Sequence, residues 1–189
     1  MRKMRRRRVR WGVLAFYVAA VLLWGAFPPA GVGAEDALLR EEEVKAAFVF
    51  NFLKFVEWPE QGAASDPLVL CVQATHPLAD TLKSLDGKEI RGRPLRVLDS
   101  VKISDLSRCQ TLFLGSGIGP DQVDAILKDL SGRAVLTLGD SPEFCAQGGM
   151  IGLVKEGNKM RFQINLRTAR AARLKISSKL LKLARHVIQ

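Results

Sequence analysis

Residues 44–59 read Val-Lys-Ala-Ala-Phe-Val-Phe-Asn-Phe-Leu-Lys-Phe-Val-Glu-Trp-Pro, and this stretch is too apolar for an ordinary surface helix. Phe48, Phe52 and Phe55 recur at helical spacing along one stripe, and Val49, Phe50 and Leu53 lie on the flanks of that stripe. More than one face of the predicted helix therefore needs cover, from the core or from a partner. The candidates for a partner or dimer interface are its aromatic residues: Phe48, Phe50, Phe52, Phe55 and Trp58.

The first 34 residues differ from the rest of the chain and predict a secretory signal peptide. Seven basic residues open the chain, residues 11–27 are apolar, and Val32-Gly33-Ala34 offers small residues for cleavage before Glu35. The apolar stretch is close to the length that spans a bilayer, so an uncleaved membrane anchor is the alternative. Residues 35–189 are expected to form a single domain, because about 155 residues suffice for a sizeable core.

The charge of the chain is concentrated at its two ends. The intact chain carries a net charge of +10, but loss of residues 1–34 leaves 22 basic against 19 acidic groups, or +3. A nucleic-acid-binding function based on net charge is therefore excluded. Residues 157–189 carry nine basic groups and no acidic one, against a net charge of −6 for residues 35–156. A solvated helix face is the ordinary interpretation, and contact with an acidic partner or an anionic membrane surface is the alternative.

Beyond residue 59, short apolar runs alternate with helix-like segments. The predicted strands cover residues 68–73, 94–98, 111–114 and 133–138, and the predicted helices cover residues 78–85 and 120–130. Strands separated by helical crossovers predict a largely parallel sheet that is covered on both faces.

The end of the chain breaks this alternation. Residues 150–155 and 159–165 flank a short turn around Gly157, so they should pair as an antiparallel hairpin. Residues 166–187 are predicted as one amphipathic helix whose basic side chains stay in water. The pattern thus indicates an α/β fold with a mostly parallel sheet, a C-terminal antiparallel hairpin and a terminal helix.

Four sequence blocks in a fixed order resemble the YfiR family of periplasmic regulators. They read Lys-Ala-Ala-Phe-x-x-Asn-Phe-x-Lys-Phe-x-x-Trp-Pro from residue 45, Gly-Gly-Met-Ile from 148, Arg-Phe-x-Ile-Asn from 161 and Ile-Ser-Ser-x-Leu-Leu from 176. The resemblance spans residues 40–186 and implies a three-layer α/β/α arrangement. The motif positions that it carries over are Asn51, Trp58, Pro59, Phe162, Asn165, Ser177 and Ser178.

Most of these motif positions have an expected structural role. Trp58 and Pro59 should end the first helix, and Phe162 should lie in the core. Ser177 and Ser178 should fasten the last helix through hydroxyl hydrogen bonds to nearby backbone.

The resemblance also implies a function. Such a protein is not an enzyme, and it binds and represses the periplasmic sensor domain of an inner-membrane diguanylate cyclase, which lowers cyclic di-GMP. An outer-membrane lipoprotein able to sequester it is a further implied partner, and the location is the periplasm. A homodimer through the first helix or a free sheet edge is equally expected. No catalytic residue, metal or cofactor is expected.

Three cysteines in an exported chain raise the question of disulfide pairing. Cys71 lies in the first predicted strand and Cys109 just before the third, so a bond is possible if these strands are neighbours; two buried free thiols are the alternative. Members of the YfiR family typically carry a second pair near the Gly-Gly segment, where Cys145 stands without its expected partner. Cys145 is then either a buried small hydrophobic residue or a reactive thiol.

The search for catalytic chemistry is largely negative. The two histidines, His76 and His186, lack metal-ligand spacing to other candidate ligands, so no metal site is expected. Gly139-Asp140-Ser141 resembles the start of a lipase-like block, but no Asp-x-x-His follows to activate Ser141. Capping of a short helical turn by Asp140 or Ser141 is the preferred interpretation.

Loops at the strand ends leave a second class of function open. Residues 115–119 read Gly-Ser-Gly-Ile-Gly and could present backbone N–H groups to an anion, although their spacing matches no nucleotide-binding motif. Ligands of doubly wound sheets bind at the carboxyl ends of the strands. Those loops contain Thr75, His76, Ser116, Asp140 and Ser141. The alternative function is therefore a small hydrolase or a protein that binds a small molecule or anion.

Overall fold

A computed structural model describes residues 32–59, 66–74, 77–99 and 103–189. The predicted signal peptide falls almost entirely outside the described residues, as do Thr75 and His76. The chain divides into two units, residues 1–37 and residues 38–189, and the second unit contains the sheet. No helix within the described ranges is long and apolar enough to cross a membrane.

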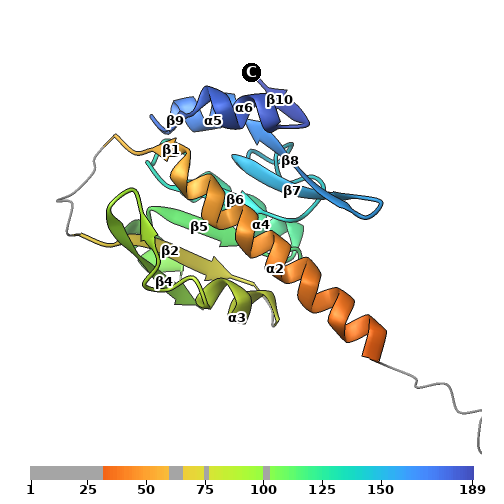
Figure 1. The fold of residues 1–189 in the computed structure, drawn as a ribbon. Coiled ribbons are helices and arrows are strands. Elements are labelled where there is room, and N and C mark those ends of the chain that lie inside the picture. Colours follow the sequence, from red (N-terminus) through yellow and green to blue (C-terminus); the bar gives the residue numbers. More distant parts are fainter. Residues whose placement is uncertain (1–31, 60–65, 75–76, 100–102) are drawn as a thin grey trace, which may run out of the picture. The chain divides into compact units, whose positions relative to one another are not determined.

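An eight-stranded mixed sheet forms the centre of the second unit (Figure 1). The strand order is β10-β8-β7-β6-β5-β2-β4-β3. The strands are β2 (Leu68–Gln73), β3 (Glu89–Ile90), β4 (Arg93–Asp99), β5 (Thr111–Leu114), β6 (Leu136–Gly139), β7 (Ile151–Glu156), β8 (Lys159–Asn165) and β10 (His186–Ile188). Neighbours are parallel except in the pairs β7–β8 and β3–β4, which are antiparallel. The predicted α/β class, mostly parallel sheet and C-terminal hairpin are confirmed.

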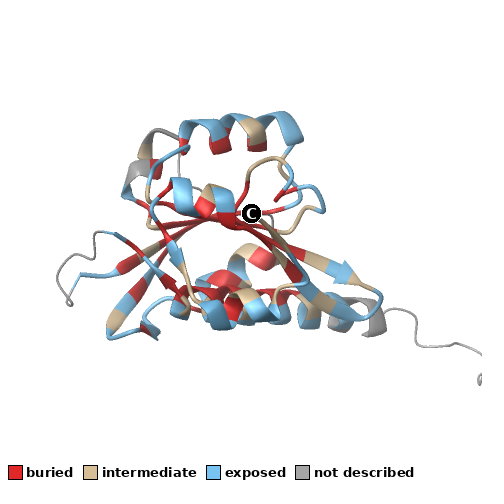
Figure 2. Ribbon diagram, turned by 90° about the horizontal axis from the view of Figure 1, so that it is seen from above, coloured by how far each residue is buried: buried red, intermediate tan, exposed pale blue. Residues whose placement is uncertain are grey.

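Helices cover both faces of this sheet, so the unit has three layers (Figure 2). The helices α2 (Val32–Lys54) and α3 (Leu78–Lys83) contribute to one hydrophobic core, and the 3-10 helix η1 (Ile103–Arg108) and α4 (Pro120–Asp129) contribute to the other. Strand β2 serves both cores, because successive side chains of a strand point to opposite faces. Leu70 and Val72 join the first core, and Cys71 joins the second.

The first helix ends at Lys54, so the prediction that Trp58 and Pro59 terminate it is wrong. The N–H of Phe55 donates to the carbonyl of Phe52 at 2.9 Å, which closes the last turn. The chain then enters a two-residue strand, β1 (Val56–Glu57), which pairs with β9 (Lys175–Ile176). Trp58 follows as a buried anchor whose indole Nε1 donates to the carbonyl of Gln110 at 2.8 Å.

The C-terminal segment is not one helix, and the prediction of a helix over residues 166–187 is wrong. It forms α5 (Leu166–Ala171), β9, α6 (Ser178–Leu183) and β10. Arg173 has a φ of 60°, a left-handed conformation that stops α5, and the N–H of Leu174 donates to the carbonyl of Ala169 at 2.9 Å. The Ser177 hydroxyl then caps α6 by accepting from the N–H of Lys179 at 3.3 Å. The expected role of Ser177 is confirmed, and Ser178 is the first residue of α6.

Phe162 and Asn165 attach the hairpin to its surroundings. Phe162 is 5% exposed, which confirms its core position, and its ring lies 5.0 Å from that of Phe52. Asn165 is 2% exposed; its Oδ1 accepts from the N–H of Thr168 at 3.0 Å and its Nδ2 donates to the carbonyl of Cys145 at 3.0 Å. This one side chain therefore caps α5 and satisfies a buried carbonyl.

We expect Asn165→Ala to lower the free energy of unfolding by about 2 kcal/mol. The substitution removes a helix cap, worth about 1 kcal/mol, and leaves the Cys145 carbonyl buried without its donor. Denaturant unfolding measures the loss. The control is Asn51→Ala, because the Asn51 amide makes an exposed hydrogen bond to the carbonyl of Ala47 within its own helix. Equal stability of the two variants would contradict the role of Asn165.

Candidate functional site

A group of charged residues with a buried centre lies where α2 passes the carboxyl ends of β5 and β6. We call it the Lys45 cluster, and it consists of Glu41, Glu42, Lys45, Asp140 and Lys155. The Lys45 Nζ lies 2.8 Å from Asp140 Oδ2 and 3.1 Å from Glu42 Oε1. The side chains of Lys45, Glu42 and Asp140 are 11%, 6% and 4% exposed. Glu41 is within 3.5 Å of Lys45 Nζ and is also paired with Lys155 of β7.

Asp140 also fixes the glycine-rich turn after β5. Its Oδ1 accepts from the backbone N–H of Ser116 at 2.6 Å, while its Oδ2 binds Lys45. The interpretation of Asp140 as a helix cap is therefore wrong, because residues 142–148 form turns and not a helix, and its carboxylate binds Lys45 of α2 and the N–H of Ser116. An anion bound at this turn would have to lie next to a buried carboxylate that already accepts from the turn.

The electrostatics of the Lys45 cluster favour permanent ion pairs. Burial by itself would lower the pKa of Lys45, but hydrogen bonds and charge from Asp140 and Glu42 raise this pKa above the ordinary lysine value. The hydrogen bond from Lys155 holds the pKa of Glu41 below its usual range. Both pKa values are thus moved further from neutral pH. General acid–base catalysis, in contrast, needs groups that titrate near neutral pH. The cluster is thus suited to holding α2 against the strand ends.

The other candidate catalytic residues are not brought together. Ser141 follows Asp140 at the end of β6, whereas His186 lies in β10, with β8 and β7 between them in the sheet order. His186 was expected in the last turn of a helix and instead pairs with Gln163 of β8. Within the described part of the chain, no group of three or more histidine, cysteine or carboxylate side chains is placed to hold a metal ion.

The cysteines separate into one disulfide and one buried thiol. Cys71 and Cys109 form a disulfide with a Cα–Cα distance of 5.8 Å, which ties β2 to the start of its neighbour β5 and confirms the predicted pairing. Cys145 is free and buried, and desolvation raises its pKa to about 11. Because a thiolate is the reactive form, this supports the interpretation of Cys145 as a small hydrophobic residue.

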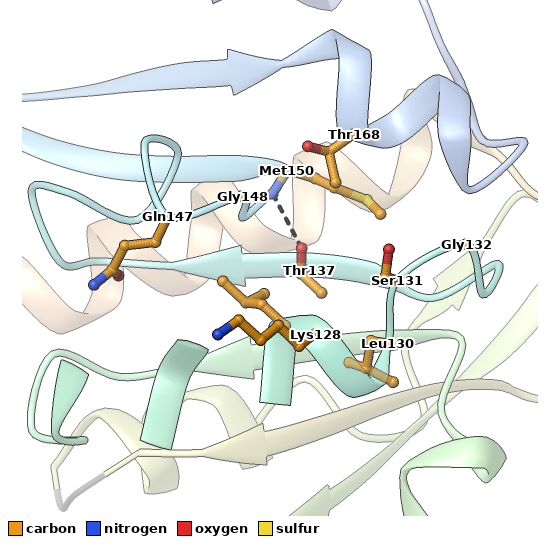
Figure 3. A pocket seen from close by; sticks show the side chains of 10 residues that line it. Lys128, Leu130, Ser131, Gly132, Thr137, Gln147, Gly148, Met150 and Thr168 are labelled. Atoms are coloured by element: carbon orange, nitrogen blue, oxygen red, sulfur yellow. Dashed lines mark hydrogen bonds between the residues drawn. The ribbon is translucent and has the colours of Figure 1, made fainter. Parts of the chain in front are cut away.

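A cavity of about 280 Å³ lies between the end of α4, β6 and the start of α5 (Figure 3). Its lining residues were not predicted, because they come from separate elements without a local motif. Figure 3 shows the polar ends of Lys128 and Gln147 on one side and the hydroxyls of Ser131 and Thr168 on the other. Thr137 accepts from the N–H of Met150 at 3.0 Å between these two groups. A small molecule with both apolar and polar groups would fit such a lining.

The aromatic interface candidates divide into core and surface residues. Phe52 and Trp58 are 1% and 7% exposed, so the core occupies their side chains and we withdraw them as contact residues. Phe48, Phe50 and Phe55 are partly buried and pack against the core. They flank what we call the outer face of α2, which consists of the exposed residues Leu39, Arg40, Glu43, Val44, Ala47 and Asn51.

The apolar part of this outer face was missed in the sequence. Leu39 and Val44 are each 43% exposed, which is unusual for large apolar side chains. The signal was present, since the first helix was predicted to be apolar on more than one face. The prediction assigned the exposed apolar surface of this helix to the phenylalanines. The structure also exposes aliphatic residues that precede the phenylalanines in the sequence.

Comparison with known proteins identifies a family and solved structures of similar fold. Residues 42–185 match a protein family described as YfiR/HmsC-like. The crystal structure of a conserved domain protein from Vibrio cholerae O1 biovar El Tor str. N16961 is similar, with a TM-score of 0.52 and 11% sequence identity. The match covers 77% of this chain and 60% of that protein. This chain therefore corresponds to only part of the length of its structural neighbour. At this identity the likeness supports the fold alone.

Proposed function

Because this chain belongs to the YfiR/HmsC-like family, we propose that it is a periplasmic repressor of an inner-membrane diguanylate cyclase. It binds the periplasmic sensor domain of the cyclase and thereby lowers cyclic di-GMP. The observation that carries the proposal is the family match over residues 42–185, which includes nearly all of the sheet unit. The Cys71–Cys109 disulfide also supports an oxidising compartment such as the periplasm.

A repressor of this kind needs no catalytic chemistry. It must bind one signalling state of its target more tightly than the other, and the difference in affinity then shifts the target toward that state. The Lys45 cluster suits such a role, because its ion pairs hold α2 rigidly on the sheet. A rigid helix presents its outer face at low entropic cost on binding.

We place the contact on the outer face of α2. Its exposed apolar residues are Leu39 and Val44, and Val44 lies one helical turn before the partly buried ring of Phe48. Apolar anchors surrounded by polar side chains are typical of protein interfaces. A homodimer would use the same surface, and an outer-membrane lipoprotein that covered it would release the cyclase.

The test is a pull-down of the exported protein against the periplasmic domains of membrane diguanylate cyclases from the same cell. We expect specific retention by one domain, and a fall in cellular cyclic di-GMP when the protein is produced. Val44→Glu should weaken retention at least tenfold, since it places a charge in an apolar contact. Gln122→Glu is the matched control, because it adds the same charge on exposed α4. Failure of every cyclase domain to bind folded protein with its disulfide intact would refute the proposal.

The cavity beside α4 favours a second candidate, a small-molecule-binding protein. A ligand held there should raise the melting temperature of the wild type, and Ser131→Leu should abolish the increase by filling the cavity. The remaining alternative is a small hydrolase, and Ser141→Ala tests it. A hydrolase would lose its turnover in this variant, whereas a repressor would keep its partner binding.

A further inference from the structure

Seven cationic side chains cover the outside of the C-terminal segment. We call this surface the basic cap, and it consists of Arg167, Arg170, Arg173, Lys175, Lys179, Lys182 and Arg185. All seven are exposed, and they lie on or next to the grouped elements α5, β9, α6 and β10 (Figure 1). Residues 157–189 contain no aspartate or glutamate. Within the described ranges, Arg185 with Glu156 is the one ion pair that this cap forms.

One large apolar side chain is exposed among these cations. Leu183 is 69% exposed, far more than any other large apolar residue of the described chain. It lies four residues after Lys179 and directly after Lys182, so helical spacing puts the three on the outward side of α6. Leu180, one turn earlier in the same helix, is 3% exposed, so it is buried where Leu183 projects into solvent. Exposure of Leu183 therefore has no explanation in the packing of this unit.

We infer that the basic cap docks on an anionic phospholipid bilayer. A cluster of lysines and arginines attracts anionic lipid headgroups, and an apolar side chain beside it adds affinity by entering the membrane interface. The cations bind the headgroups and Leu183 enters the apolar boundary below them. Protein interfaces, in contrast, are depleted in lysine, and a positive patch in them meets a negative patch that fixes the register. The cap contains three lysines and has no acidic residue that would fix such a register.

The charge of the remaining chain orients this docking. Residues 35–156 carry a net charge of −6, so an anionic surface repels them while it attracts the C-terminal segment. The basic cap therefore faces the bilayer. This inference does not depend on the proposed function, although docking would concentrate a repressor at the membrane that holds its target.

The experiment is sedimentation with vesicles of phosphatidylcholine that contain phosphatidylglycerol, compared with vesicles of phosphatidylcholine alone. The protein is recovered from the periplasm and its N-terminus is read by mass spectrometry, because an intact basic N-terminus would itself bind. We expect binding to the anionic vesicles alone, and weakening as salt rises. Each cation at such a surface contributes about fivefold in affinity, so Lys179→Gln with Lys182→Gln should weaken binding about 25-fold. Leu183→Ser should weaken it about tenfold.

A matched double variant controls for total charge. Lys88→Gln with Lys128→Gln removes the same charge from exposed positions outside the basic cap and should change binding by less than about twofold. Equal losses in the two double variants, or equal binding to both kinds of vesicle, would overturn the inference. Retention on polyglutamate without vesicle binding would also overturn it and would identify an acidic protein as the partner. The vesicles contain no cyclase, so this result is independent of the pull-down.

Discussion

Replacing Lys45 with methionine should lower the free energy of unfolding by about 4 kcal/mol, since it leaves buried carboxylates without their cation. Asp140 and Glu42 have side chains that are 4% and 6% exposed, and both bind the Lys45 ammonium. Methionine keeps most of the apolar stem of lysine, so the change isolates the loss of charge from the loss of packing. Guanidinium unfolding followed by circular dichroism measures the difference.

Removing the stranded charges should restore most of this loss. In the triple variant Lys45→Met, Glu42→Gln, Asp140→Asn, the amide oxygen at position 140 can still accept from the N–H of Ser116. Buried ion pairs can often be replaced by neutral groups at little cost, whereas removal of one partner is costly. We therefore expect the triple variant to recover more than half of the stability lost in the single variant.

An exposed ion pair provides the control. Lys83 and Asp99 are 3.1 Å apart, with side chains that are 60% and 49% exposed. Lys83→Met should leave the free energy of unfolding nearly unchanged, because water screens such exposed pairs. If Lys45→Met were as mild as Lys83→Met, the Lys45 cluster would not hold α2 on the sheet.

The parallel part of the sheet could be predicted because each of its strands can be recognised from its own residues. Residues 68–73 and 111–114 are continuous apolar runs that are buried on both faces, and the structure places β2 and β5 at those residues. The hairpin was equally local, since residues around Gly157 provide the turn between β7 and β8. The disulfide followed once these strands were taken as neighbours.

The C-terminal segment shows where local periodicity misleads. Residues 166–187 have helical spacing of apolar and basic side chains, yet Arg173 in a left-handed conformation divides them. The capping serine at position 177 was visible in the sequence and would have divided the predicted helix. Left-handed backbone at an arginine has no comparable signal, because glycine or asparagine normally occupies such positions.

The Lys45 cluster could not be derived from spacing. Lys45 and Asp140 are 95 residues apart in the sequence, and each has an ordinary local interpretation. Lys45 reads as a solvated charge on a helix, and Asp140 reads as a helix cap. Their contact depends on how α2 crosses the carboxyl ends of β5 and β6, which only the tertiary fold determines.

Loss of the Cys71–Cys109 disulfide should lower the free energy of unfolding by about 4 kcal/mol. The bond closes a loop with a sequence separation of 38 residues between β2 and the start of β5. In the chain-entropy description, opening a loop of this length gives the unfolded chain freedom worth about 4 kcal/mol. The variant Cys71→Ala with Cys109→Ala should show this loss in denaturant unfolding.

Reduction should reproduce the effect, and the third cysteine provides the control. Dithiothreitol should destabilise the wild type by a similar amount and leave the double alanine variant unchanged. Cys145→Ala should keep the full response to dithiothreitol, because burial raises the pKa of the Cys145 thiol to about 11 and keeps it unreactive in the folded protein. A wild type whose stability does not respond to reduction would show that native packing, and not the covalent link, holds β2 and β5 together. The reduced protein would then remain folded, and reduction could not serve to inactivate it.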